Sequence, residues 1–242
     1  MFWNSTGRPF GDKQVATIES FVLTQPRCLE LWIWTNDDMK LQLEIAALGQ
    51  HAYLSDRIKI LLYDPHGLSV GTPLEGRGDI LEGSDVVATK ADILRALILN
   101  HYDGIYVDFD SVFLQVNSFE LVCAVTVQFV MDSSQSLCPL LSIEWAYQWK
   151  VFNVLNSAVM RLTPRGETVV AMLGMMATKY PWYDFNAEIV TPLLQRSYFP
   201  HCLFDPEWET EAFIGFFDQR VDDPDWAQWY IDHAFIYHYH NQ

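Results

Sequence analysis

Short apolar runs recur along the chain, separated by polar segments. These runs carry the β-branched and aromatic residues that strands favour, and turn-forming residues bound them. Runs of this length with such boundaries are typical of buried strands. The predicted strands are residues 29–34, 58–63, 105–107, 121–131 and 154–162.

Segments between these strands repeat their apolar residues with helical spacing. Residues 38–48 and 89–99 show this repeat. Proline is favoured at the first position of a helix, so Thr163–Pro164 predicts a third helix that runs to about Lys179.

The order of the elements predicts the fold class. Strands that alternate with helices indicate an α/β fold with a central, mostly parallel mixed sheet covered on both faces. Residues 64–84 are rich in Gly and Pro and are predicted to form a long surface loop. We expect residues 1–242 to form a single domain.

The segment from residue 89 to residue 110 combines a predicted helix, a turn and a strand. Thr89 and Asp92 have the spacing of a capping box, and Gly104 can adopt positive φ in the turn before the strand. Asp92 and Arg95 lie beside the apolar stripe of the helix. That stripe consists of Ile93, Leu94, Leu97 and Ile98.

Two carboxylates, Asp108 and Asp110, follow the apolar run that ends at Val107. In an extended segment, residues two apart project to the same side, so both side chains are predicted to enter one crevice at the strand's carboxyl end. Hard oxygen ligands of this kind suit Mg²⁺ or Mn²⁺. On its own, an Asp-x-Asp sequence more often marks a turn that closes a strand.

Composition and net charge limit the kinds of molecule that this protein is expected to bind. Half of the 242 residues are apolar, which is enough for one well-buried core, and the formal net charge is −16. This charge argues against nucleic acid and anionic membrane surfaces as partners. A diphosphate ligand would need local positive charge, which a divalent ion on Asp108 and Asp110 could supply with help from Lys90 and Arg95.

Several stretches resemble the family 32 glycosyltransferases, especially the α1,4-galactosyl and α1,4-N-acetylglucosaminyl transferases. Residues 90–95 (KADILR) and 104–110 (GIYVDFD) are similar to the family's sugar-binding DXD region. Weaker similarities cover residues 2–4, 18–21 and 31–34, residues 156–160 and the terminal residues 236–241, where His240 stands in place of the usual tryptophan.

The resemblance implies a GT-A fold and a metal-dependent enzyme. Such an enzyme moves a hexose or N-acetylhexosamine from a UDP-sugar to a carbohydrate or glycolipid acceptor with retention of configuration, using Mn²⁺ or Mg²⁺. It also implies a Golgi-luminal, membrane-tethered protein. The sequence contains no 18-residue apolar stretch and no recognisable targeting segment, so a cytoplasmic location stays open.

Roles for individual residues follow from the same resemblance. Asp110 is the expected direct metal ligand, Asp108 the contact to the ribose and the metal's water shell, and His238 the third ligand. The other expected donor contacts are Phe2 and Trp3 at the uracil, Asp92 and Arg95, and Asn156 at the sugar hydroxyls. Asp184 and Glu188 are the candidate catalytic residues, at the reacting sugar or the acceptor.

Two other interpretations remain open. Residues 183–188 lack both glycines and the proline of the family's Trp-Gly-x-x-Gly-Pro stretch, which would suit a catalytically degenerate sugar-binding protein. Alternatively, Asp108 and Asp110 would be the nucleophile and general acid of a haloacid-dehalogenase-type phosphatase, with Asp222–Asp223 as its distal metal pair. The four cysteines show no zinc-ligand spacing.

Overall fold

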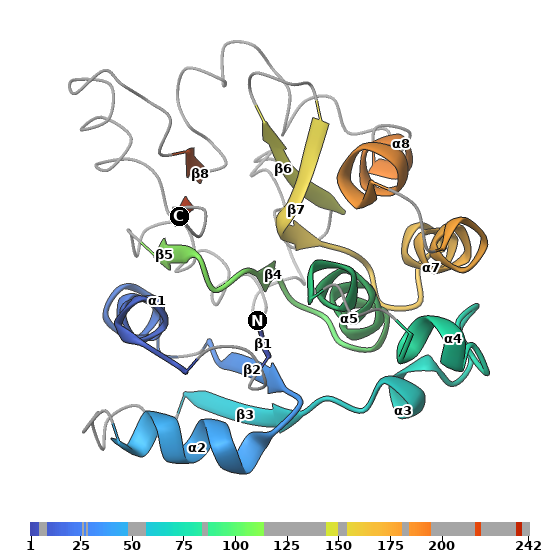
Figure 1. Ribbon diagram of the computed structural model, residues 1–242. Helices are drawn as coiled ribbons and strands as arrows, with labels where there is room; N and C mark the ends of the chain where they lie inside the picture. The colour runs from blue at the N-terminus through green and yellow to red at the C-terminus, as the bar shows by residue number, and fades with distance from the viewer. Residues whose placement is uncertain are drawn as a thin grey trace, which may run out of the picture. The chain divides into compact units, whose positions relative to one another are not determined.

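The structure is a computed structural model (Figure 1). It describes residues 1–4, 9–25, 27, 29–47, 57–83, 87–113, 144–149, 154–180, 184–194, 216–218 and 236–238. The chain divides into two compact units. Unit 1 comprises Met1–Asn4, Tyr63–Asp108 and Leu140–Phe199, and unit 2 comprises Ser5–Leu62, Phe109–Pro139 and Pro200–Gln242.

Unit 1 is built around helix α5 and an antiparallel sheet. Its elements are β1 (Phe2–Trp3), α3 (Pro65–Ser69), α4 (Gly78–Leu81), α5 (Val87–His101), β4 (Tyr106–Val107), β6 (Trp145–Trp149), β7 (Val154–Arg161), α7 (Glu167–Lys179), the π-helical segment η2 (Phe185–Val190) and α8 (Thr191–Leu194). The sheet has the strand order β4-β7-β6, and both of its pairings are antiparallel.

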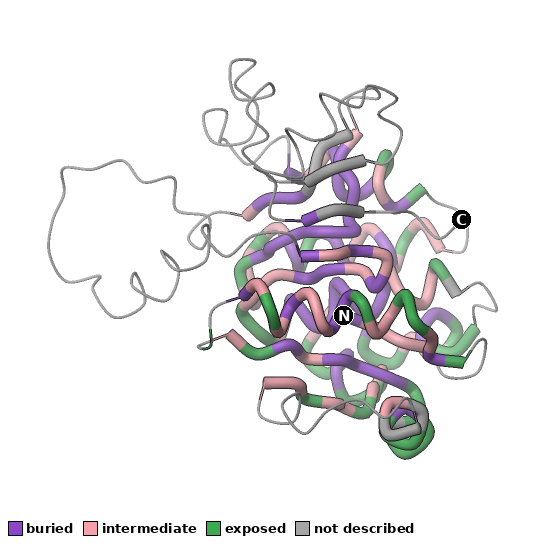
Figure 2. Tube along the Cα trace, turned by 90° about the vertical axis from the view of Figure 1, so that its left-hand side faces the viewer, coloured by how far each residue is buried: buried purple, intermediate pink, exposed green. Residues whose placement is uncertain are grey.

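Helix α5 is buried on all sides over its second half. Every residue from Ile93 to Asn100 is buried, and α5 packs against α7 and α3. Strand β7 is buried as well from Leu155 to Arg161. Figure 2 colours the described residues by burial, with the buried ones in purple. A helix buried all round has no solvent face, so any polar side chain on it must find partners inside the protein.

Strand β7 contains a bulge. Its pairing with β6 passes from Ala146 with Met160 directly to Tyr147 with Asn156, so residues 157–159 have no partner on β6. A bulge of this kind interrupts the alternation of side chains and redirects them locally.

Unit 2 contains parallel and antiparallel pairings. Its elements are α1 (Asp12–Thr24), β2 (Leu31–Thr35), α2 (Asp38–Ala47), β3 (Ile58–Leu62), β5 (Ser111–Phe113), β8 (Phe216–Asp218) and β9 (Ile236–His238). Strands β2 and β3 pair in parallel, and α2 packs against both. Strand β9 pairs antiparallel with β5 and parallel with β8.

Helix α1 holds the segment around β5 through hydroxyl groups. The Thr17 Oγ1 donates to the carbonyl of Phe109 at 3.0 Å. The Ser20 Oγ accepts from the N–H of Phe113 at 3.0 Å, and the Thr24 Oγ1 donates to the Phe113 carbonyl at 3.5 Å. The spacing of three and four residues places these hydroxyls on one face of the helix.

The periodic helices and strands are confirmed. Residues 38–48 correspond to α2 and 89–99 to α5, and β2, β3, β4 and β7 lie within or beside their predicted ranges. Gly104 has φ +140, as its place in the turn predicts. The predicted strand at 121–131 lies outside the described residues.

Three predictions about local structure are wrong. Residues 64–84 are not only a surface loop, because α3 and α4 form there and bury Leu68, Leu74 and Ile80. The long helix does not open at Thr163. Residues 163–166 form a turn in which Gly166 N–H donates to the Thr163 carbonyl at 2.9 Å, and α7 begins at Glu167.

The third error concerns the start of α5. This helix begins at Val87, so Thr89 lies inside it and is not its N-cap. A capping box with Asp92 is therefore not formed, and Asp92 is available for other partners. No helix among the described residues is long and apolar enough to cross a membrane.

Candidate functional site

The candidate site in unit 1 centres on Arg95, a buried cation on α5 with 6% of its surface exposed. Its Nε donates to the Ala91 carbonyl one turn earlier at 3.3 Å, and its Nη1 donates to the Ser157 hydroxyl. The guanidinium also lies 4.9 Å from the ring centroid of Tyr106 and 5.8 Å from that of Phe185. Hydrogen bonds and aromatic faces therefore fix its position.

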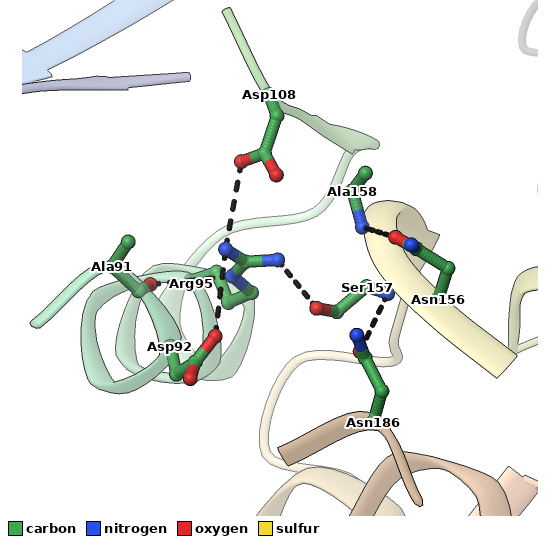
Figure 3. A network of polar contacts seen from close by, with 8 residues as sticks. All are labelled: Ala91, Asp92, Arg95, Asp108, Asn156, Ser157, Ala158 and Asn186. Atoms are coloured by element: carbon green, nitrogen blue, oxygen red, sulfur yellow. Dashed lines mark hydrogen bonds and ion pairs between the residues drawn. The ribbon is translucent and has the colours of Figure 1, made fainter. Parts of the chain in front are cut away.

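Two carboxylates meet at the remaining end of this guanidinium. The Arg95 Nη2 lies 3.5 Å from an oxygen of Asp92 and 3.5 Å from an oxygen of Asp108. Their side chains are 18% and 27% exposed, so both are shielded without being sealed from solvent. Figure 3 shows the guanidinium between the two carboxylates, with Ser157 at its other amino group.

The cluster holds more negative than positive charge. Burial raises the pKa of Asp92 to about 7; Arg95 lowers this pKa, while Asp108 and Asp184 raise it. Burial also raises the pKa of Tyr106 well above its usual range, and a hydrogen bond with Asp108 acts in the same direction. Tyr106 therefore keeps its proton and donates to Asp108.

Asp184 and Glu188 organise the start of η2. The Asp184 carboxylate accepts from Ala187 N–H at 3.0 Å, and Glu188 accepts from Asp184 N–H at 3.2 Å. Glu188 also forms a 2.7 Å ion pair with Lys179, and that hydrogen bond lowers the pKa of Glu188. Asp184 is close enough to Asp92 to raise its pKa, whereas Glu188 is paired with Lys179 at the exposed surface.

The asparagines beside the cluster bind main-chain groups. The Asn156 side-chain carbonyl accepts from Ala158 N–H at 2.7 Å, and Asn156 is 6% exposed. Asn186 accepts from Ser157 N–H at 2.9 Å. The sequence did not indicate a role for Asn186, since its partner Ser157 lies 29 residues away along the chain.

The segment that contains Asp108 and Asp110 is not one extended strand. Strand β4 ends at Val107, and Phe109–Asp110 form a turn before β5. The last hydrogen bond to β7 before this turn joins the Asp108 N–H to the Ala158 carbonyl at 2.8 Å. The prediction that Asp108 and Asp110 lie two apart in one extended segment is therefore wrong. Asp108 belongs to unit 1 and Asp110 to unit 2.

Within unit 2, the C-terminal strand β9 lies beside the residues that follow Asp110. The β5–β9 register pairs Ser111 with His238. The backbone of the predicted third metal ligand is therefore adjacent to that of the residue after Asp110, although the His238 side chain lies outside the described set. Among the side chains that the structure describes, no group of three or more His, Cys, Asp or Glu is placed to hold a metal ion.

The two aromatic residues predicted at the uracil are in β1 of unit 1. Phe2 and Trp3 are both partly exposed. The Phe2 ring meets the Tyr63 ring edge-on, with 5.8 Å between centroids. This ring contact is typical of hydrophobic packing. The stacking of Phe2 and Trp3 on the uracil ring stays a prediction.

Comparison with known proteins identifies the fold. No protein-family model matches the sequence, and no curated protein matches it. Among solved structures, the PaToxG glycosyltransferase matches with a TM-score of 0.56 and 12% identity, covering 82% of this chain and 67% of that one. Mouse xyloside xylosyltransferase 1 in its apo form matches with a TM-score of 0.55 and 13% identity, covering 100% of this chain and 96% of that one.

At these identities the likeness is one of fold. The chain has an α/β fold of the GT-A type, the fold class predicted from the sequence. The more specific similarity to family 32 remains a resemblance of short motifs.

Proposed function

We propose that this protein is a metal-dependent glycosyltransferase that moves a hexose or N-acetylhexosamine from a UDP-sugar to a carbohydrate acceptor, with retention of configuration. The glycosyltransferase fold supports the reaction class. The single observation that carries the proposal is the convergence of Asp92 and Asp108 on the buried Arg95.

The cluster suits a sugar better than it suits a phosphate. Hydrogen bonds and ion pairs within the protein already engage the Nε and both amino groups of Arg95. Its role would be to orient and partly neutralise the two carboxylates, whose remaining lone pairs can accept from sugar hydroxyls. Asp184, which acts electrostatically on Asp92, would add a third acceptor.

A divalent ion would be held by Asp110 and His238, both in unit 2, and the family resemblance alone adds Asp108 to this set. Carboxylate oxygens and an imidazole nitrogen suit Mn²⁺ or Mg²⁺ as a donor set, and the β5–β9 register supports this assignment. When bound, such an ion screens the charge of the leaving diphosphate as a Lewis acid. The glycolipid acceptor and the Golgi lumen follow from the resemblance alone and stay predictions.

A screen of UDP-sugars tests the proposal. UDP-glucose, UDP-galactose, UDP-N-acetylglucosamine and UDP-N-acetylgalactosamine are each added with and without MnCl₂, and the melting temperature is measured. At least one sugar nucleotide is expected to raise the melting temperature in a Mn²⁺-dependent way. No shift with any of them, at concentrations up to the millimolar range, would contradict the proposal.

A matched pair of variants then locates the ion. Asp110→Asn keeps the shape of the side chain and removes its charge, and should weaken Mn²⁺-dependent UDP binding on the order of a hundredfold. Asp12→Asn makes the same chemical change at an exposed position of unit 2 and should leave binding unaltered. Equal binding by the two folded variants would remove Asp110 from the metal site.

The catalytically degenerate alternative is supported by residues 184–188. Glu188 is committed to Lys179 and to the start of η2, which leaves Asp184 as the better candidate at the reacting sugar. Calorimetric binding of a UDP-sugar without turnover, with acceptors ranging from water to mono- and disaccharides, would favour this alternative. The phosphatase interpretation finds no support in the fold, and Asp222–Asp223 lie outside the described residues.

A further inference from the structure

On the side of β6, the bulge in β7 is held by side chains, while its other side pairs with β4. Residues 157–159 have no partner on β6, and β4 pairs only with Val159 and Met160. Two amide side chains accept from the main-chain N–H groups that have no partner on β6. Asn186 accepts from Ser157 N–H at 2.9 Å, and Asn156 accepts from Ala158 N–H at 2.7 Å. Without these acceptors, two main-chain N–H groups would be buried without hydrogen bonds.

The bulge directs Ser157 toward the cluster. Ser157 is 2% exposed, and its hydroxyl accepts from the Nη1 of Arg95, whose other amino group faces Asp92 and Asp108. Figure 3 shows this chain of contacts, which runs from Asn186 through Ser157 to the guanidinium of Arg95. A shift of the Ser157 backbone would therefore move the guanidinium relative to both carboxylates.

The same helical segment is attached to β7 at a second point that does not involve the cluster. The Thr191 Oγ1 accepts from Leu155 N–H at 2.9 Å and donates to the Asn186 carbonyl at 2.7 Å. Thr191 is 9% exposed. This attachment offers a comparison, since it also supplies a side-chain acceptor to a main-chain N–H of β7.

We propose that Asn186 is a positioning residue for the donor sugar, acting through Ser157 on the orientation of Arg95. Its side-chain carbonyl fixes the bulge, the bulge fixes the Ser157 hydroxyl, and that hydroxyl fixes the guanidinium that aligns Asp92 and Asp108. The inference rests on the proposed glycosyltransferase function and adds to it a residue from the stretch that departs most from the resembled family.

The test compares Asn186→Ala with Thr191→Val. Each variant removes one hydrogen bond between this segment and β7, and Thr191→Val also removes the bond to the Asn186 carbonyl, so both are expected to lower the melting temperature. Only Asn186→Ala should weaken binding of the UDP-sugar selected in the Mn²⁺ screen, by about tenfold, while binding of UDP alone stays unchanged because the cluster would contact the sugar. Equal loss in both variants, or equal loss of UDP and UDP-sugar binding by Asn186→Ala, would overturn the positioning role.

A conservative variant and a double-mutant cycle sharpen the result. Asn186→Asp keeps an acceptor oxygen of the same reach and should bind the UDP-sugar within about threefold of the wild type, which also guards against misfolding of Asn186→Ala. In a Ser157→Ala background, Asn186→Ala should have little further effect on affinity, since the connection to Arg95 is already lost. Full additivity of the two changes would contradict an action through Ser157.

A readout independent of substrate separates this inference from the proposed function. The side-chain Nε–H resonance of Arg95 reports how firmly the guanidinium is held, and it should exchange faster with solvent in Asn186→Ala and Asn186→Ala/Thr191→Val than in Thr191→Val. If the wild type binds no UDP-sugar, the proposed function fails, and this resonance still decides whether Asn186 holds Arg95. An unchanged exchange rate in Asn186→Ala would overturn the positioning role whatever the protein binds.

Discussion

Two arginines of unit 1 have side chains that are equally buried, at 7% exposure, yet their surroundings differ. Arg161 on β7 makes a 2.9 Å ion pair with Asp103, whose side chain is 68% exposed. Arg95 on α5 makes longer, 3.5 Å contacts with Asp92 and Asp108, whose side chains are 18% and 27% exposed. The shorter contact is the one that solvent can replace.

This difference suggests different roles: the Arg161–Asp103 pair stabilises a turn, whereas the cluster of Arg95, Asp92 and Asp108 suits ligand binding. Asp103 can be solvated when its partner is lost, so Arg161 mainly ties the turn before Gly104 to the sheet. Asp92 and Asp108 share one cation in a shielded place, and burial raises the pKa of Asp92. Shielded carboxylates in excess of their cation are an unfavourable arrangement that folding alone does not require.

The largest expected effect comes from removing each cation. Arg95→Met removes the cation shared by two shielded carboxylates and is expected to cost about 3–5 kcal/mol of unfolding free energy at pH 8, less near pH 5 where Asp92 binds a proton. Arg161→Met leaves an exposed carboxylate and should cost roughly 1–3 kcal/mol, independent of pH in this range. Urea unfolding at both pH values measures the difference, and equal losses for the two variants would refute the contrast.

The carboxylates provide the next comparison. Asp108→Asn should weaken UDP-sugar binding by about tenfold to a hundredfold, because a charged acceptor is lost beside Arg95. Asp103→Asn makes the same change at the other ion pair and should leave binding unaltered. Calorimetry with the selected UDP-sugar and Mn²⁺ measures both, and a matching loss in Asp103→Asn would mean that net charge, not position, governs affinity.

The raised pKa of Asp92 predicts how stability depends on pH. The folded protein holds this proton up to about pH 7, whereas the unfolded chain releases it near pH 4, so stability falls as the pH rises through that window. Asp92→Asn should flatten this dependence and be the more stable protein at pH 8, by about 1–2 kcal/mol. A wild-type stability that rises between pH 4 and pH 7, with no difference in slope for Asp92→Asn, would show that Asp92 titrates normally.

The smallest effect is expected at the surface pair of Lys179 and Glu188. Their side chains are 36% and 46% exposed, and such pairs contribute little. Lys179→Met should change the unfolding free energy by less than about 1 kcal/mol and leave UDP-sugar binding unchanged. A large loss of affinity would instead place Glu188 in the reacting region, as its sequence position predicts.

The sequence predicted what depends on local patterns. Helix α5 and strands β2, β3 and β7 follow from the spacing of their apolar residues, and Gly104 follows from the turn that it must make. The motif resemblance also grouped Asp92, Arg95 and Asp108, and the structure brings these three together.

What the sequence did not reveal depends on contacts between distant segments. In the bulge at 157–159, the N–H of Ser157 binds the side chain of Asn186, 29 residues away along the chain, and not a residue of β6. Helix α7 begins after the turn at 163–166 and not at Thr163 as predicted. Glu144 accepts from the Thr163 N–H at 2.9 Å and also from the Thr168 hydroxyl. Neither partner is visible in a window of neighbouring residues.

The hydroxyl-bearing face of α1 has a consequence for how this chain can change. Thr17, Ser20 and Thr24 bind the main chain of Phe109 and Phe113, on either side of Asp110, and do not bind the side chains between them. These three hydrogen bonds do not pass through the side chain of residue 110. The anchoring of the main chain on both sides of Asp110 can therefore be kept while the chemistry of that one side chain changes.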